Sequence, residues 1–437
     1  AYMATVQKDQ IILDDGSSSQ NPGVHPGRGG HDLSARNTLR AGDSVTSVVG
    51  VVDQLTVSGA LPYETSYRIQ PTVEPVFTGA ARPTAADLSA AITGAEVKVA
   101  SVNVLNYFTT LGTASFTTPN GTSHSGRGAT NAAEFTRQQD KIVANLLDLD
   151  ADVLGLMEIQ NNGFANGASA IDALVDALNA VAGAGTYAYI SGAFNDGVTT
   201  AGNAATAGDD AIMVAILYKP ATVTPVGQAA VADPTVYDAF SATYGNRVPV
   251  AQTFQAVADG EKFTAVVNHF KSKGSATATQ GLDLNDGAGN ANLARMEAAR
   301  DLLAWLGTYP TGCADTDVLL LGDFNAYSQE GPITHLDANG FNKVSTGLSY
   351  SFDGLWGSLD PALDALRISD LVAGAVKWAI NAEEPAVIDY NTEFKNDAQD
   401  ASYYSADAYR SSDHNPILIG LNLSTAAPAP APAPAPA

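Results

Sequence analysis

From residue 96 onward, the chain alternates near-continuous apolar runs with stretches whose apolar residues have helical spacing. Three stripes of the helical kind are present: Phe135, Ile142, Leu146 and Leu149; Ile171, Leu174, Val175, Leu178 and Val181; and Leu293, Met296, Leu302 and Leu306. The apolar runs between them suit strands that other layers cover on both faces: residues 97–102, 153–157, 212–217, 263–267, 318–321 and 417–421. This alternation predicts a layered α/β fold with buried sheets.

Residues 1–95 have a different pattern, in which short β-like runs are separated by clusters of Gly, Ser, Asn and Pro. We expect a small β-barrel or sandwich in this part. At the other end of the chain, residues 427–437 alternate Ala and Pro. Because proline fixes φ and lacks an N–H donor, an extended spacer roughly 30 Å long is predicted there. The predicted division is a β domain over 1–95, an α/β domain over 96–424, and a tail or linker over 425–437.

Composition narrows the chemistry that the chain can use. Of its 437 residues, 45% are hydrophobic and 16% are charged, so it can bury a substantial core. The formal net charge of -24 repels polyanions at long range, so a nucleic-acid substrate would require local cations or a bound metal. Cys313 is the only cysteine, which excludes an intrachain disulfide and Cys-based zinc sites within one chain. No apolar run is long enough to span a membrane, and the first residues lack a leader, so we expect any signal peptide to be removed or left out.

Polar side chains stand where several of the apolar runs end or begin. They are Asn103 after 97–102, Glu158 after 153–157, His269 after 263–267, Asp323 and Asn325 after 318–321, and Asp413 and His414 before 417–421. Burying an unpaired carboxylate or imidazole costs several kcal/mol, so we expect these groups to converge on one another, on a metal or on solvent in a cleft. Taken singly, Gly-Asp-x-Asn is more often a turn and Ser-x-Asp a local hydrogen-bonded loop. His269 alone could be a structural histidine and Glu158 alone a solvated strand end, but five such strand ends in one domain favour a shared site.

The residue types indicate a hard cation. Carboxylate and amide oxygens suit Mg²⁺ or Mn²⁺, and the chain has no His-x-x-x-His or Cys pair for zinc. Such an ion polarises a phosphoryl oxygen and lowers the pKa of a bound water, while a nearby imidazole moves protons. Calcium is a second candidate ion, because residues 283–290 carry acids and amides at alternating spacing; a plain solvated loop explains them equally well.

Five segments together resemble the endonuclease/exonuclease/phosphatase superfamily, which includes pancreatic deoxyribonuclease: SVNVLNYF, LGLMEIQNN, VVNHFKSKG, LLLGDFNAY and SSDHNP. Over about 97–423 the chain is most similar to the ExeM/NucH group of bacterial extracellular nucleases. This resemblance implies a four-layered α/β/β/α sandwich and a secreted or cell-surface location in a bacterium. It also implies metal-dependent hydrolysis of phosphodiester bonds in DNA, with RNA as a second candidate, by attack of an activated water with histidine assistance. Residues 10–72 resemble the OB-like domain that often precedes such a catalytic domain.

The resemblance assigns metal binding to Asn103, Glu158 and Asp413, with Glu158 as the principal ligand and Asp413 acting directly or through water. In addition to these ligands, it implies a DNA partner and a monomer. The tail would connect the protein to a cell surface or to a further module.

The resemblance assigns the catalytic roles to five other residues. Asp323 and Asn325 would position the attacking water and the scissile phosphate. His414 would be the essential imidazole, oriented by Asp360, and His269 would act at the leaving side. Which histidine is the base and which is the acid stays open.

Three basic residues flank the family segments and are candidate contacts for substrate phosphates: Lys271, Lys273 and Arg410. They stand out because the chain has only 22 Lys and Arg. One departure from the family pattern is the segment GSLDPAL, in which Pro361 stands where a histidine is usual. Proline stiffens the backbone next to the proposed orienting Asp360.

Two other functions remain open at this point. One is a phosphodiesterase or phosphatase of the same fold that acts on phospholipid or sugar phosphate, although no apolar hairpin for membrane contact is evident. The other is a catalytically inactive surface protein that binds nucleic acid. The presence of Glu158, Asp323 and His414 argues against the inactive protein.

Overall fold

The computed structural model describes residues 9–17, 25–56, 65–191, 208–344, 347–352, 355–365 and 368–425. The predicted Ala/Pro tail falls outside these residues. Within the described part, no helix combines the length and the hydrophobicity that a bilayer crossing requires.

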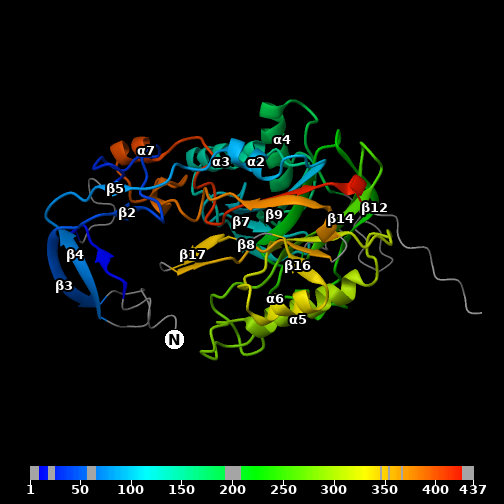
Figure 1. The fold of residues 1–437 in the computed structure, drawn as a ribbon. Coiled ribbons are helices and arrows are strands. Elements are labelled where there is room, and N and C mark those ends of the chain that lie inside the picture. The colour runs from blue at the N-terminus through cyan, green and yellow to red at the C-terminus, as the bar shows by residue number, and fades with distance from the viewer. Residues whose placement is uncertain are drawn as a thin grey trace, which may run out of the picture.

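The first of two large sheets brings together strands from distant parts of the chain (Figure 1). In order across the sheet they are β10 (Ala188–Tyr189), β11 (Ile212–Tyr218), β9 (Val153–Gln160), β6 (Val97–Tyr107), β21 (Ile417–Leu421) and β20 (Val372–Lys377). Strands β6 and β9 are parallel, and the other neighbours are antiparallel. Four of the predicted apolar runs lie in this sheet, which confirms them as buried strands.

The second sheet also has six strands and also contains one parallel pair. The order is β12 (Val223–Val231), β13 (Val250–Ala256), β14 (Lys262–His269), β15 (Val318–Asp323), β19 (Leu363–Ala365) and β16 (Phe341–Lys343). Strands β14 and β15 are parallel, whereas the other neighbours are antiparallel. The two remaining predicted runs are β14 and β15.

Helices cover the outer face of each sheet (Figure 1). Those on the first sheet are α2 (Ala85–Ala91), α3 (Ala132–Leu149) and α4 (Ala170–Ala182), and those on the second are α5 (Asn292–Leu306) and α6 (Gly331–Ala338). Helix α4 begins after Ser169, whose side chain accepts a hydrogen bond from the Asp172 N–H. The layers run helix, sheet, sheet, helix, and the mixed α/β class is confirmed.

Helix α5 differs from its predicted stripe. It buries Ala294, Ala298 and Leu302, whereas Leu293 is 44% exposed. Small alanine side chains allow the helix to approach the second sheet closely, and the sequence stripe gave too much weight to large residues.

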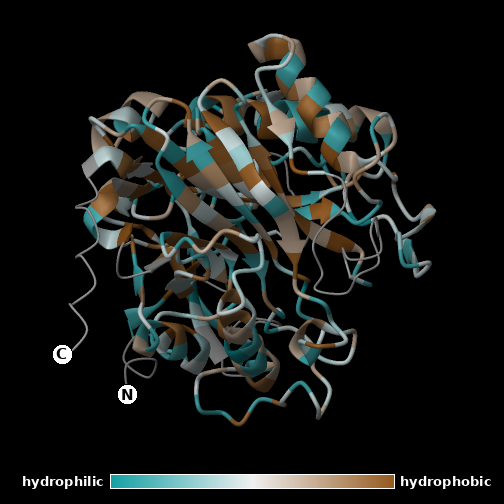
Figure 2. Ribbon diagram, turned by 90° about the vertical axis from the view of Figure 1, so that its right-hand side faces the viewer, coloured by the Kyte–Doolittle hydropathy of each residue, from teal (hydrophilic) through white to brown (hydrophobic). Residues whose placement is uncertain are grey.

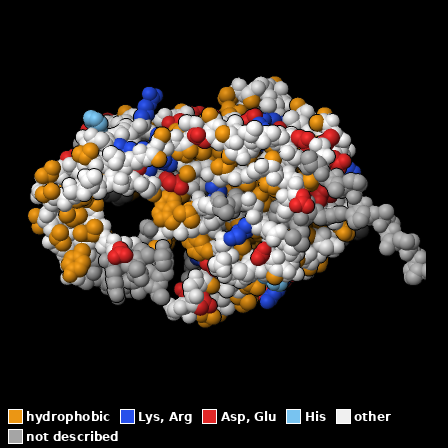
Figure 3. All heavy atoms as spheres, in the orientation of Figure 1, with side chains coloured by type: hydrophobic (Ala, Val, Ile, Leu, Met, Phe, Trp, Pro, Cys, Tyr) orange, Lys and Arg blue, Asp and Glu red, His pale blue; other side chains and the backbone are white. Residues whose placement is uncertain are grey.

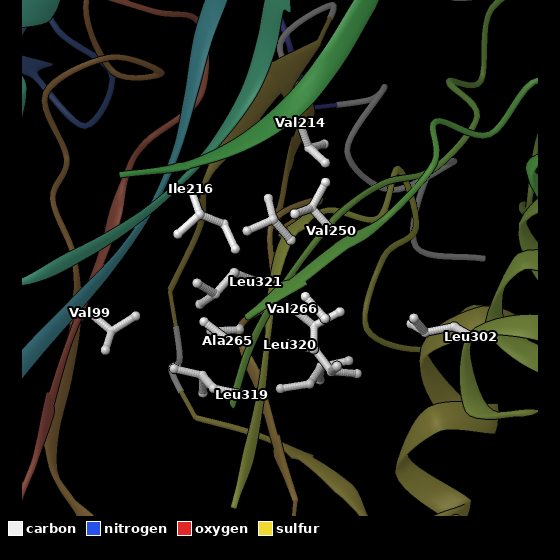
Figure 4. Close-up of a cluster of buried hydrophobic side chains, with 14 of the residues drawn as sticks. Val99, Val214, Ile216, Val250, Ala265, Val266, Leu302, Leu319, Leu320 and Leu321 are labelled. Atoms are coloured by element: carbon white, nitrogen blue, oxygen red, sulfur yellow. The ribbon is translucent and has the colours of Figure 1, made fainter. Parts of the chain in front are cut away.

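The space between the two sheets is filled by aliphatic side chains (Figure 4). Val99 and Ile216 project into it from the first sheet, and Leu321 does so from the second. The sheets approach closely at Gly155 of β9, where an added Cβ would lie 2.7 Å from Val267 Cγ2. Hydrophobic residues accordingly concentrate in the central strands (Figure 2). This rigid interior holds the strand ends, and with them the polar residues, in fixed positions.

The residues before α2 form a three-stranded sheet and a two-stranded ribbon. The sheet has the order β1 (Ile12–Leu13), β4 (Thr65–Pro71), β3 (Gly50–Thr56), and the ribbon pairs β2 (Ser44–Val45) with β5 (Phe77–Thr78). Arg68 ties the sheet together through Asp14 at 2.9 Å and Asp53 at 2.7 Å. Val51 and Tyr67 are exposed, and hydrophobic side chains gather at this end of the molecule (Figure 3).

These strands do not close into a barrel within the described residues, so the predicted OB-like barrel is not confirmed. The likeness to that domain rested on short strand-like runs, and such runs alone do not specify closure. The end of the predicted 1–95 domain packs on the large α/β part, because Leu88 and Ile92 belong to the core under the first sheet's helices.

Smaller elements complete the described chain. They are the hairpin β7 (Ser115–Thr117) and β8 (Ser123–Ser125), the hairpin β17 (Tyr350–Phe352) and β18 (Leu355–Gly357), helix α7 (Asp397–Tyr403), and the 3₁₀ turns at Asp238–Phe240, Ile368–Leu371, Ala386–Ile388 and Leu423–Thr425.

Candidate active site

The two parallel strand pairs bring polar residues to one rim of the sandwich. Because the strands of a parallel pair point the same way, their carboxyl ends lie at the same edge of the sheet. In the first sheet this places Asn103 of β6 near Glu158 of β9. In the second sheet β14 ends at His269 and β15 ends at Asp323, directly opposite each other. The two edges meet, since Nε2 of His414, which lies just before β21 of the first sheet, is 3.8 Å from Asp323 Oδ2 of the second.

Glu158 lies in an irregular part of its strand. Its φ is 68°, a left-handed conformation that costs a non-glycine residue roughly 1–3 kcal/mol, and the pairing of β9 with β11 shifts register between Met213 and Ala215. The carboxylate accepts hydrogen bonds from Asn103 Nδ2 at 3.1 Å and from the Asn106 N–H at 2.9 Å. The β-bulge therefore aims the side chain, and the two asparagines hold it.

His414 is held by a carboxylate and by an aromatic ring. Its Nδ1 lies 2.7 Å from Asp360 Oδ2, and the same oxygen accepts a hydrogen bond from Ser349 Oγ at 2.7 Å. The Tyr350 ring stacks on the imidazole, with centroids 4.5 Å apart and an interplanar angle of 28°. Because a carboxylate faces Nδ1, that nitrogen carries the proton, and Nε2 points toward the rest of the site.

Asp323 lies between the two histidines. Its Oδ2 is 3.7 Å from His269 Nε2 and 3.8 Å from His414 Nε2. The other oxygen accepts the Asn325 N–H at 2.8 Å, and Asn325 Nδ2 donates to the Phe270 carbonyl at 3.1 Å. Asn325 also has a left-handed backbone, with φ 48°. The turn after β15 thus fixes both Asp323 and the amide that follows it.

The two imidazoles have opposite electrostatic surroundings. Burial would lower the pKa of His414, but three carboxylates, led by Asp360, outweigh it and raise that pKa well above its usual range. For His269, burial and the nearby charge of Arg247 lower the pKa well below its usual range. Near neutral pH, His414 is therefore protonated and His269 is neutral.

Two groups of side chains among the described residues fit a divalent cation. In the first, burial and then the charge of Asp413 raise the pKa of Glu158. A carboxylate whose charge a neighbouring carboxylate disfavours fits a cation between the two, and carboxylate oxygens suit Mg²⁺ or Mn²⁺. The second group is Asp323, Asp360 and His414, whose ligand atoms lie within 4.8 Å of one another.

The described geometry agrees with a comparison against protein families. A model of the endonuclease/exonuclease/phosphatase family matches residues 100–414. The chain belongs to this family. Its members hydrolyse phosphoester bonds, and this family member is a hydrolase of that class. The matched region contains every predicted site residue, from Asn103 to His414. No curated protein matches the chain in sequence, so the likeness to the ExeM/NucH group stays a prediction.

Solved structures of the family are similar to this hydrolase at low sequence identity. A family protein from Bacteroides vulgatus is 15% identical, with a TM-score of 0.44, over 75% of this chain and 98% of that chain. The mannosyl-6-phosphatase of Bacteroides thetaiotaomicron is 14% identical, with a TM-score of 0.42, over 75% and 99%. The D. rerio TDP2 complex with a single-strand DNA product is 12% identical, with a TM-score of 0.41, over 75% and 98%.

Two of the three predicted phosphate contacts are engaged with the protein itself. Lys273 Nζ forms an ion pair with Glu330 at 2.5 Å. Arg410 Nη1 donates to the Asn381 carbonyl at 2.8 Å. A role for these two residues at a substrate phosphate stays a prediction. Lys271 is half-buried, and burial and then the charge of a neighbouring arginine lower its pKa.

That arginine, Arg247, was missed by the sequence reasoning. Its side chain is 9% exposed, its Nη1 donates to the Phe270 carbonyl at 3.1 Å, and its Nε lies 3.4 Å from Asp210. Together with Arg127 it lines a pocket beside the β7–β8 hairpin. The signal that could have found it is an arginine directly before the apolar run of β13. Tyr350 and Ser349 were also missed, because they contact His414 and Asp360, which are not their neighbours in sequence.

Proposed function

We propose that this hydrolase is a metal-dependent phosphodiesterase that cleaves nucleic acid, with DNA as the first candidate substrate and RNA as the second. The observation that carries the proposal is the position of Asp323 between two imidazoles of opposite protonation state. A binding protein has no need for such an arrangement, whereas hydrolysis of a phosphodiester requires one group that accepts a proton and one that donates it.

We assign the cation to Glu158 and Asp413, with Asn103 beside them. In the alternative group, the Nδ1 of His414 is already engaged by Asp360 at 2.7 Å, and a cation there would have to compete with that contact. Asn103 donates to Glu158 through Nδ2, and its Oδ1 accepts the Leu105 N–H at 2.9 Å, which leaves one lone pair of that oxygen for a ligand bond. When bound, Mg²⁺ or Mn²⁺ polarises a phosphoryl oxygen.

Calcium gains no support from residues 283–290. Asp283 accepts the Asn285 N–H at 2.8 Å, and Asp286 accepts the Ala288 N–H at 2.9 Å. These local turns explain the alternating acids without a bound ion.

Two histidines of the chain would carry out the two proton transfers of the reaction. Neutral His269 accepts a proton, and protonated His414 donates one, with Asp360 stabilising its charge. One oxygen of Asp323 lies between the two rings, 3.7 Å from His269 Nε2 and 3.8 Å from His414 Nε2. Asn325 offers an amide near the same point, where it can orient a phosphate oxygen.

Nucleic acid is supported over a small monoester by the basic residues beside the site. Burial lowers the pKa of Lys271, and the charges of Arg247 and Arg127 lower it further. The two arginines line one pocket, and there we place a flanking phosphate of a polymer. In a chain of net charge -24, such local cations are what a polyanion requires to approach. A secreted or cell-surface location and a monomeric state stay predictions of the sequence.

One side-by-side digest tests the proposal. Purified protein is incubated with circular plasmid, linear duplex and RNA in Mg²⁺ or Mn²⁺, in parallel with EDTA, and with a phospholipid and a sugar phosphate. We expect cleavage of nucleic acid that stops in EDTA. Cleavage that persists in the chelator would contradict the cation assignment. Hydrolysis of only the phospholipid or sugar phosphate would contradict the substrate.

A further inference from the structure

Three side chains from the amino-terminal segment meet at one buried carboxylate of the family region. Arg82 donates to both oxygens of Glu384, from Nε at 2.9 Å and from Nη2 at 2.8 Å. Thr38 Oγ1 donates to Glu384 at 2.7 Å, and Arg40 Nε forms an ion pair with it at 2.6 Å. The donors lie outside residues 100–414, which match the family model, so the cluster is an addition to the family fold.

Further contacts tie the same two segments together. The Ala41 N–H donates to the Glu383 carbonyl at 3.0 Å, and Arg40 Nη2 donates to the Ala379 carbonyl. The guanidinium of Arg82 stacks on the Tyr409 ring, 4.1 Å from its centroid. The contact therefore combines charge, backbone hydrogen bonds and stacking.

The turn that ends at Glu384 also holds the loop that carries the proposed catalytic residues. Asn381 Nδ2 donates to the His414 carbonyl at 2.7 Å, and the Asn381 N–H donates to Asn415 Oδ1 at 3.0 Å. The Glu384 N–H donates to the Asn381 carbonyl at 3.1 Å, which closes the turn. Asn381 is fully buried, so a shift of Glu384 is transmitted to His414 through packed groups.

The cluster is a positioning device because of its geometry. A bidentate guanidinium–carboxylate pair fixes direction as well as distance. Such control matters here, because His414 must keep Nδ1 on Asp360 while Nε2 faces Asp323. A displacement of about 1 Å at a catalytic group can reduce rates roughly 100-fold.

We propose that Arg40 and Arg82 are positioning residues for the active site. They fix Glu384, and through its turn they set where His414 lies against Asp360. The amino-terminal segment is thus a structural part of the catalytic centre. The kinetic test of this proposal rests on the proposed phosphodiesterase function, whereas the structural test does not.

The test compares Arg40→Lys, Arg82→Lys and the double variant with the full-length wild-type protein. Lysine keeps the charge but cannot make the bidentate contact of Arg82 with Glu384, nor replace both contacts of Arg40, with Glu384 and with the Ala379 carbonyl. Hydrolysis of bis(4-nitrophenyl) phosphate is used, because so small a substrate cannot reach the amino-terminal strands. We expect kcat to fall roughly 10- to 100-fold while KM changes less than about twofold. The matched control is Arg68→Lys, which alters a similar cluster with Asp14 and Asp53 and is expected to keep wild-type kcat.

A second readout does not depend on activity. The imidazole Nδ1–H of His414 in its hydrogen bond to Asp360 is followed by proton NMR in wild type and variants, and we expect it to shift and to exchange faster in the variants. If the arginine variants do not fold, the same two measurements are made on Thr38→Val. This substitution removes one hydrogen bond to Glu384 and leaves the size of the side chain nearly unchanged. Wild-type kcat together with an unchanged resonance in folded variants would overturn the inference. An inactive wild type would instead count against the proposed function, and the resonance alone would then decide.

Discussion

The two six-stranded sheets each contain one parallel pair, but the pairs present their polar residues in different ways. In the first sheet the pair is irregular, because the register of β6 and β9 shifts between Asn103 and Tyr107, and Glu158 has a left-handed backbone. In the second sheet the pairing of β14 and β15 is regular to its last residues, with His269 opposite Asp323. In the proposed site the irregular pair would supply oxygen ligands, and the regular pair brings a histidine and a carboxylate to within 3.7 Å of each other.

This difference indicates a division of labour. Bulges re-aim a side chain, as a carboxylate that must face a cation requires. Regular pairing instead fixes the distance between two neighbouring side chains, as proton transfer requires. His414 joins the two halves, because it precedes β21 of the first sheet while its partner Asp360 precedes β19 of the second. The ends of β6 and β9 are thus expected to govern cation binding, and the ends of β14 and β15, together with the His414–Asp360 pair, to govern proton transfer.

The largest effect is expected for Glu158→Gln in the first sheet. Loss of the carboxylate charge weakens the cation site, so kcat/KM should fall by roughly 1,000-fold or more, about 4 kcal/mol of transition-state stabilisation. Affinity for Mn²⁺, measured by calorimetry, should fall with it. Glu297→Gln on the surface of α5 is the control. Wild-type Mn²⁺ affinity in a folded Glu158→Gln variant would contradict the proposal that the parallel pair of the first sheet binds the cation.

His269→Gln in the second sheet should lose activity but keep the cation. Removal of a proton acceptor lowers kcat by about 100- to 1,000-fold, while Mn²⁺ affinity should stay within about twofold of wild type, since His269 is no ligand in the proposed site. His335→Gln in α6 is the matched control. A parallel loss of Mn²⁺ binding would show that the two sheets share the cation.

Asp360→Asn should have an intermediate effect with a pH signature. Because Asp360 raises the pKa of His414, its neutralisation lowers that pKa. A protonated donor is lost as pH rises through its pKa, so the alkaline fall of the kcat profile should move to lower pH. We expect kcat near the optimum to drop about 10- to 100-fold. Asp152→Asn, a buried carboxylate that accepts the Lys98 N–H, is the control; an unshifted profile would contradict the proton-donor role of His414.

Ser349→Ala should have the smallest effect. It removes a hydrogen bond of 2.7 Å to Asp360 and an acceptor for the N–H groups of Leu359 and Asp360, and it leaves the contact of Asp360 with His414 in place. A loss of about 1 kcal/mol corresponds to a roughly fivefold lower kcat. Ser351→Ala in the same hairpin is the comparison. A loss as large as that of Asp360→Asn would mean that the hydroxyl, rather than the carboxylate, orients the imidazole.

Much of the α/β fold could be predicted from local sequence. Strands buried on both faces must be apolar throughout, which is why β6, β9 and β15 stand out, and Ser169 marks the start of α4. The buried face of α5 could not be read in this way, since alanines face the sheet. Nor did short amino-terminal runs determine whether their strands close, because closure depends on pairing between distant segments.

The site was predictable to the extent that its residues end strands. Asn103, Glu158, His269 and Asp323 each follow an apolar run, and the structure brings them together. Contacts between residues that are far apart in sequence could not be predicted, because no short sequence motif marks them. Arg247 and the cluster at Glu384 depend on segments that are far apart in sequence, and the left-handed backbone of Glu158 depends on how β9 pairs with β11.

The proposed roles of the two sheets depend most on where the cation lies. Anomalous diffraction from a crystal soaked in Mn²⁺ tests this directly. We predict one peak about 2.1 Å from a carboxylate oxygen of Glu158 and on the side that faces Asp413. A peak among Asp323, Asp360 and His414, with none at Glu158, would contradict the cation assignment and the division of labour between the two sheets.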